Sequence, residues 1–134
     1  MKKTYKGSCH CGKVRFEVDL DLGAGTVKCN CSVCAKQRSW LAAVSPADVR
    51  LLAGESELAY YRFGARRIHH RFCRTCGVRS FGQANMEDSA AAFYAINLGA
   101  LDNVEPAELA NAPVMHVDGR NDNWGSAPAE TRHL

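Results

Sequence analysis

No stretch of the sequence approaches the roughly 20 consecutive apolar residues that a membrane-spanning helix needs. The N-terminus carries charge but no hydrophobic region behind it, so we expect no secretory signal. Neither sign of charge dominates, because the net charge is only +3. The basic residues are also dispersed and not interleaved with aromatic side chains, which argues against nucleic acid as a partner. We therefore expect a cytoplasmic protein that does not associate with membranes.

Several familiar catalytic and nucleotide-binding patterns are also missing. The chain has no Ser-His-Asp order, no Walker-type loop and no Gly-x-Gly-x-x-Gly motif. It has no internal repeat, low-complexity stretch or linker that would divide it. A length of 134 residues without such divisions favours a single domain over residues 1–134, with a core at about 4–124 and a tail at 125–134.

Short alternations of apolar and polar residues predict a mainly β protein, built as a small antiparallel sheet or barrel. The clearest is GKVRFEVD at residues 12–19, where Val14, Phe16 and Val18 alternate with charged residues. This is the period of a strand with one buried face. Further strands are predicted at residues 38–44, 57–63, 66–72, 78–83, 91–98 and 114–118.

Three short segments predict turns between the strands. Residues 45–48 and 105–109 each place a proline directly after a potential capping residue, so we expect one or two short helical turns there. The sequence GAG at residues 23–25 is typical of a hairpin turn. None of these segments leaves room for a long helix.

Cysteine is the residue that the sequence has in quantity. An odd total of seven argues against a purely disulfide framework. In a reducing compartment, clustered cysteines more often bind metal. The seven fall into three local groups, which are Cys9-x-Cys11, Cys29-x-Cys31-x-x-Cys34 and Cys73-x-x-Cys76.

Only one partition keeps each group intact and gives a closed four-ligand site, namely Cys9 and Cys11 together with Cys73 and Cys76. Residues two apart in a strand point to the same face, so Cys9 and Cys11 could present both sulfurs to one ion. Cys73 and Cys76 bracket a tight turn followed by Gly77, which is the form of a zinc knuckle. Four thiolates favour zinc over iron here, so we expect one structural zinc.

The other three cysteines, Cys29, Cys31 and Cys34, are left as a trio. Three protein ligands and one open position are typical of a catalytic zinc, whereas a closed site is structural. The trio could instead be partly vacant, oxidised, or closed by a histidine into a second structural site. His70 and His116 are the histidines that could reach it.

Four segments carry a resemblance to a known family, namely GSCHCGKVRFEV (7–18), CNCSVCAK (29–36), LAGESELAYYRFG (52–64) and HHRFCRTCGVRSFG (69–82). Together they resemble the glutathione-dependent formaldehyde-activating enzyme family, which is grouped with centromere protein V. The similarity runs in order over roughly residues 4–124. It implies a zinc-binding β-tent fold. It also implies a structural zinc on Cys9, Cys11, Cys73 and Cys76 and a second, open zinc site on Cys29, Cys31 and Cys34.

Our leading hypothesis is a zinc-dependent carbon–sulfur lyase or synthase that acts on a thiol of the glutathione type and a small aldehyde. The substrate thiol would bind the open position at the trio as a thiolate, because coordination to zinc deprotonates a thiol. Arginines pair well with the carboxylates of a peptide-like thiol. The candidates for that role are Arg38, Arg66, Arg67 and Arg120.

Two other interpretations of the cysteines remain open from the sequence alone. The first is a non-catalytic module with two structural metal sites that binds a protein or nucleic-acid partner. The closing motif DGRNDNW at residues 118–124 supports it, because that motif is similar to the centromere protein V branch. The second is a thiol redox enzyme or zinc sensor that uses Cys31 and Cys34, although no βαβ pattern surrounds them.

Overall fold

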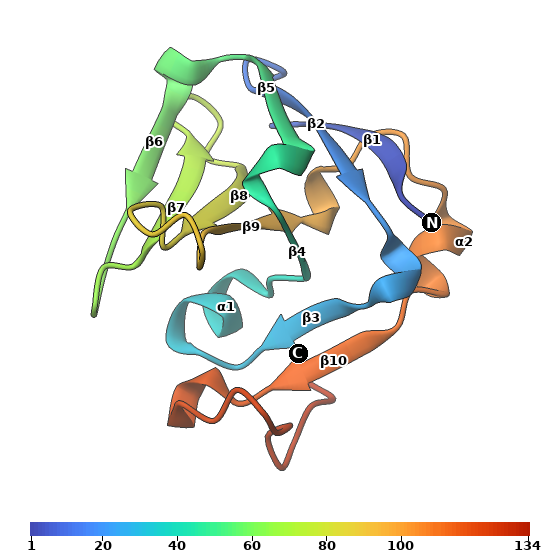
Figure 1. The fold of residues 1–134 in the computed structure, drawn as a ribbon, viewed down its shortest axis with the longest axis vertical. Coiled ribbons are helices and arrows are strands. Elements are labelled where there is room, and N and C mark those ends of the chain that lie inside the picture. The colour runs from blue at the N-terminus through green and yellow to red at the C-terminus, as the bar shows by residue number, and fades with distance from the viewer.

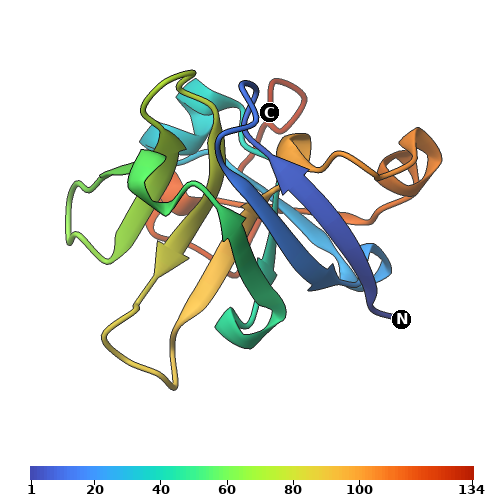
Figure 2. The same cartoon turned by 90° about the horizontal axis from the view of Figure 1, so that it is seen from above.

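A computed structural model describes residues 1–134 as two β-sheets that pack across each other (Figures 1 and 2). The small sheet has the order β1-β2-β5, and the large sheet has the order β10-β3-β4-β9-β8-β7-β6. Neighbouring strands are antiparallel except β10 and β3, which are parallel. The strands are β1 (Lys3–Ser8), β2 (Arg15–Leu20), β3 (Thr26–Cys29), β4 (Leu41–Val44), β5 (Val49–Ala53), β6 (Leu58–Tyr61), β7 (Ile68–Cys73), β8 (Arg79–Ala84), β9 (Phe93–Asn97) and β10 (Val114–Val117).

Helical structure is confined to short segments. Both expected turns are confirmed: Ser45 caps the first, and Glu105 and Glu108 form a capping box on α2. Lys3 and Tyr5 of β1 hydrogen-bond to Glu108 of α2, so α2 lies against β1 although the two are far apart in the sequence (Figure 1). None of the helices is long and apolar enough to span a bilayer. The helices are α1 (Ser32–Gln37), α2 (Pro106–Ala110) and the 3₁₀ turns η1 (Leu22–Ala24), η2 (Pro46–Asp48), η3 (Glu55–Glu57), η4 (Leu98–Ala100) and η5 (Gly119–Asn121).

The mainly β prediction is confirmed, with two short α-helices. The predicted hairpin at residues 23–25 is wrong, because the strands on either side of it do not pair with each other. Asp21 accepts a hydrogen bond from the backbone of Gly23 (2.9 Å) and starts η1. This turn carries the chain from the small sheet to the large one.

The hydrophobic core lies between the two sheets and joins them. Phe16 of β2 meets Phe81 of β8 edge to face, with ring centroids 5.6 Å apart and an interplanar angle of 83°. Ile96 and Leu98 are buried beside them in the same cluster of 16 residues. Full burial of one such side chain contributes about 1.5–3 kcal/mol. The core therefore fixes β7 and β8 relative to the N-terminal strands, which brings distant cysteines together.

Candidate functional site

Two segments that are far apart in the sequence bring four cysteines to one point. The sulfur atoms of Cys9, Cys11, Cys73 and Cys76 all lie within 4.8 Å of one another. The Cys9–Cys11 and Cys11–Cys73 sulfurs are 3.6 Å and 3.7 Å apart. Zinc–sulfur bonds of about 2.3 Å at tetrahedral angles require sulfurs about 3.8 Å apart, so this cluster fits a zinc ion. The expectation that Cys9 and Cys11 lie in a strand is wrong, because β1 ends at Ser8.

Matching turns present the two cysteine pairs. In each turn the N–H of the first cysteine, Cys9 or Cys73, donates to the carbonyl of the residue five positions on, at 3.0 Å in both cases. Gly12 and Gly77 follow the second cysteines, and both have a φ of +79°. Residues that carry a side chain rarely adopt a backbone with this positive φ, so glycine suits both positions. The tight turn predicted at Cys73 is found, and the N-terminal pair repeats it.

Backbone amides favour the thiolate form of Cys73 and Cys76. The N–H of Cys76 lowers the pKa of Cys73, and the N–H of Cys11 lowers the pKa of Cys76 to about 6. Val14 also donates its N–H to the sulfur of Cys9 at 3.3 Å. Thiolates are the form that binds metal, so the local backbone prepares these ligands.

The trio forms where β3 passes into α1. Cys29 ends β3, Cys31 precedes the first residue of α1, and Cys34 lies within that helix. Their sulfurs lie within 4.8 Å of one another, and no histidine nitrogen or carboxylate oxygen completes the set. Helical spacing places Cys31 and Cys34 on one face. The predicted grouping of the three is thus found, and the histidine that could have closed it is not part of the cluster.

Contacts among the three thiols shift the pKa values of Cys31 and Cys34 in opposite directions. Hydrogen bonds from Cys29 and Cys34 lower the pKa of Cys31 to about 2. Hydrogen bonds with Cys29 and Cys31, together with burial, raise the pKa of Cys34. Cys31 also donates its N–H to the sulfur of Cys29 at 3.3 Å. The lowered pKa favours the thiolate form of Cys31, which is the form that binds a metal or attacks an electrophile.

A cavity of about 710 Å³ opens directly beside the trio. One face of the large sheet contributes to its lining, where Ala43 lies opposite Ala95 and Ala84 lies opposite both Ile68 and Phe93. Residues directly opposite across strands share a face, and small side chains there leave space above the sheet. The remaining lining is mostly apolar and includes Phe63, Val117 and Trp124.

Arg79 brings a positive charge into this cavity. Its Nη1 donates to Gln37 Oε1 (2.6 Å) and Ser39 Oγ (3.3 Å), and its Nε is buried without a partner. The guanidinium lies over Gly82, whose missing Cβ would come within 3.0 Å of Nη2. Burial lowers the pKa of Arg79, although the nearby Cys34 opposes that shift. A partly desolvated cation thus lies next to the trio.

His70 faces the same cavity and is neutral. Burial, with Arg79 as the second cause, lowers the pKa of His70 to about 4. Its Nδ1 is buried without a hydrogen-bond partner, and its ring stacks on Phe63 with centroids 5.5 Å apart. The neighbouring His69 points to the other face and stacks on Tyr60. His70 is therefore an uncharged imidazole available to a ligand.

The four predicted arginines are not brought together. Arg120 lines the cavity, and its Nε donates to the carbonyl of Asn30 at 3.1 Å. The side chains of Arg38, Arg66 and Arg67 are exposed and take no part in the lining. Sequence reasoning missed Arg79, whose inward direction depends on strand register.

The segment after β10 closes over the trio. Asp118 is buried and accepts a hydrogen bond from Asn30 Nδ2 at 2.8 Å. This bond holds the next residue, Gly119, against Cys29. Trp124 then lines the cavity mouth. The DGRNDNW motif therefore belongs to the site, although it supplies no ligand.

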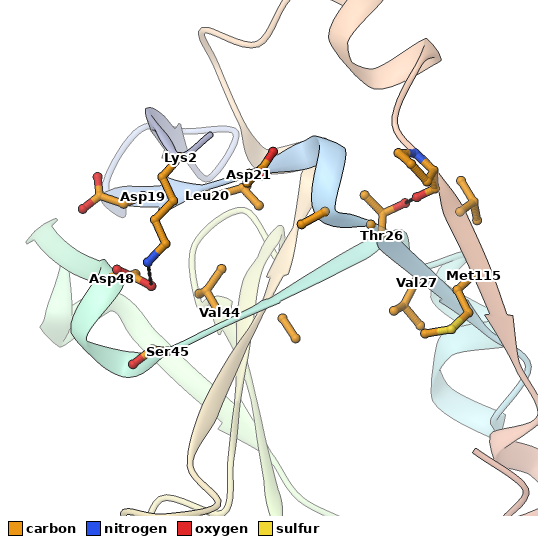
Figure 3. A pocket seen from close by; sticks show the side chains of 15 residues that line it. Lys2, Asp19, Leu20, Asp21, Thr26, Val27, Val44, Ser45, Asp48 and Met115 are labelled. Atoms are coloured by element: carbon orange, nitrogen blue, oxygen red, sulfur yellow. Dashed lines mark hydrogen bonds and ion pairs between the residues drawn. The ribbon is translucent and has the colours of Figure 1, made fainter. Parts of the chain in front are cut away.

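A second cavity of about 580 Å³ lies between the end of β2 and strands β3, β4 and β10 (Figure 3). Its charged groups pair with each other or with neighbours: Lys2 Nζ is 2.9 Å from Asp48, and Asp21 binds the N-terminal ammonium at 2.8 Å. It contains no cysteine and no histidine. We therefore take the cavity at the trio as the candidate site.

Two comparisons relate the chain to known proteins. A family model described as glutathione-dependent formaldehyde-activating enzyme matches residues 4–118. The crystal structure of a Rhodobacter sphaeroides protein is similar, with 35% sequence identity and a TM-score of 0.69. The match covers 82% of this chain and 99% of that one.

Proposed function

The chain belongs to the glutathione-dependent formaldehyde-activating enzyme family, and from that premise we propose a zinc-dependent carbon–sulfur lyase or synthase. The substrates would be a thiol of the glutathione type and a small aldehyde. One observation carries the proposal: Cys29, Cys31 and Cys34 converge without a fourth protein ligand in the wall of a large cavity. A purely structural site would be closed and would need no cavity.

The seven cysteines would form two metal sites with different roles. A structural zinc would be held by Cys9, Cys11, Cys73 and Cys76, and it would tie the N-terminal segment to the middle of the chain. A zinc held by the trio would supply a Lewis acid that keeps a substrate thiol deprotonated near neutral pH. The fit of the trio rests on its mutually close sulfurs and on the lowered pKa of Cys31.

Arg79 has the position to offset negative charge at the trio. Three thiolates and an incoming substrate thiolate would repel one another, and a cation in a desolvated site attracts them strongly. Arg79 is held there by Gln37 and Ser39, so its guanidinium is oriented before substrate arrives. We assign it the role of a positioning cation for the anionic sulfur.

The reaction itself is an addition. The substrate sulfur forms a bond to the carbonyl carbon, the carbonyl π bond breaks, and the proton released by the thiol ends on the new hydroxyl. Negative charge develops on the carbonyl oxygen, so a donor nearby stabilises it. His70 is neutral and can donate a hydrogen bond from a ring nitrogen, which suits that task.

The test is a rate measurement with the zinc-loaded protein. Glutathione and formaldehyde should react faster than their uncatalysed background, and Cys31→Ser should abolish the difference while the fold and about one zinc per chain remain. Lys36→Ala, on the exposed side of α1, is the matched control and should keep the full rate. Absence of any acceleration with every thiol tried would rule out the enzyme, and global unfolding of Cys31→Ser would make the trio structural.

A further inference from the structure

The cavity at the trio is much larger than a small aldehyde requires. Its volume is about 710 Å³, within the range of about 300–1,000 Å³ that suits a drug-sized ligand. Formaldehyde is little larger than a water molecule, which takes about 30 Å³ in the liquid. The cavity therefore has room for a further group, and its lining indicates what kind.

That lining is apolar over most of its surface. Apart from the three cysteines of the trio, eleven of the 19 lining residues are apolar, and none is an aspartate or glutamate. Phe93 and Ile68 lie opposite Ala84 on the neighbouring strands, and Trp124 lies at the mouth. Buried apolar surface contributes about 25 cal/mol per Å², so such walls select an apolar occupant.

The peptide part of glutathione is a poor match for these walls. Its ammonium group would find no carboxylate in the cavity, and a buried unpaired charge is costly. Arg120 is exposed at the edge of the cavity and could meet a carboxylate of a peptide that stays in solvent. The interior of the cavity is then free for the second, non-peptide group that is bonded to the substrate sulfur.

We propose, resting on the function above, that the aldehyde substrate carries an aromatic group or an aliphatic chain of several carbons, which fills this interior. The bonds made and broken are those of the addition already described, with the carbonyl carbon now bearing the apolar group. The preferred adduct is a thiol whose sulfur carries a hydroxylated carbon with a bulky apolar substituent. Formaldehyde would be accepted but not favoured.

Calorimetric titration of the zinc-loaded protein with S-methyl, S-hexyl and S-benzyl glutathione measures the fit without turnover. Each fully buried methylene should tighten binding roughly fourfold, since it contributes about 0.8 kcal/mol. S-hexyl and S-benzyl glutathione should thus bind far more tightly than S-methyl glutathione. Equal affinities across the series would overturn the inference.

Two variants keep the test specific to the cavity. Ala95→Leu fills the space beside the sheet and should remove the preference for S-benzyl glutathione while S-methyl glutathione still binds. Phe93→Ala enlarges the interior and should shift the preference towards the longer S-hexyl chain. Ala53→Leu, on the exposed end of β5, should change nothing. A preference that survives Ala95→Leu would place the apolar group elsewhere and refute the proposal.

Rates with formaldehyde, butanal and benzaldehyde at one glutathione concentration separate this inference from the proposed function. Higher acceleration with the larger aldehydes supports both. Acceleration that is greatest with formaldehyde would overturn the inference and leave the enzyme in place. No acceleration with any aldehyde, alongside tight binding of S-benzyl glutathione, would overturn the enzyme and leave the apolar site supported.

Discussion

A Cβ atom on Gly119 would lie 2.6 Å from the sulfur of Cys29, a separation that real Cβ atoms do not adopt. The same atom would also press on the ring of Trp124. Gly119→Ala should therefore displace Cys29 and open the trio. We expect the zinc content of the purified protein to fall from about two ions per chain to about one, measured by elemental analysis, with the circular dichroism spectrum unchanged.

Gly125→Ala is the matched control in the same segment. A Cβ there meets no atom within 4 Å, so its zinc content should equal that of the wild type. Retention of both zinc ions by Gly119→Ala would show that the close approach is not needed to shape the trio.

The cysteine groups were predictable because their spacing is local, but the reason given for one of them was wrong. Cys9 and Cys11 converge through a glycine turn and not through a strand. The strand β1 escaped prediction because Gly7 takes one of its buried positions; a Cβ on Gly7 would lie 2.2 Å from the ring of Phe16. A glycine at a buried strand position does not count as hydrophobic, so the alternating pattern that would predict the strand is interrupted.

The cavity was harder to foresee than the metal clusters. α1 has only six residues and no apolar stripe long enough to reveal a helix. The inward positions of Arg79 and His70 depend on the register of β7 and β8, which includes an irregularity between Arg71 and Phe72. Such a shift moves side chains between faces and leaves no signal in composition.

Loss of the four-cysteine site should cost far more than loss of the trio. Cys73 is fully buried and its sulfur contacts that of Cys11. Structural zinc contributes on the order of 10 kcal/mol, comparable with the whole net stability of a domain. We expect Cys73→Ser to be largely unfolded at 25 °C by circular dichroism, whereas Cys34→Ser stays folded. A folded Cys73→Ser protein would contradict the structural assignment.

Arg79→Gln should weaken the thiol substrate selectively. The variant keeps a polar side chain for Ser39 but loses the charge beside the trio. A charge-assisted contact is worth about 1.5–3 kcal/mol, so the KM for glutathione should rise roughly 10- to 100-fold. Arg79→Lys should recover part of this, because it restores the charge without the planar fork. Arg38→Gln, exposed at the end of α1, should match the wild type, and an equal loss there would point to a diffuse surface effect.

Acid should loosen the contact between α2 and β1. The carboxylate of Glu108 accepts hydrogen bonds from the N–H of Glu105 (2.9 Å), Lys3 Nζ (2.9 Å) and the hydroxyl of Tyr5 (2.7 Å). The backbone of Glu105, followed by Lys3 and Tyr5, lowers the pKa of Glu108 from 4.5 to about 2. These bonds are strongest while the carboxylate is charged, so protonation weakens them.

The sign of the pH dependence follows from the two pKa values. Between about pH 4.5 and pH 2 the unfolded chain takes up a proton that folded Glu108 does not, so stability falls as the pH falls through this window. The melting temperature of Glu108→Gln should lie below that of the wild type above pH 5, and the two should converge towards pH 2. Glu55→Gln, an exposed side chain in η3, serves as the control and should show no such convergence. A difference for Glu108→Gln that stays constant with pH would mean that its hydrogen bonds, and not its charge, hold α2 in place.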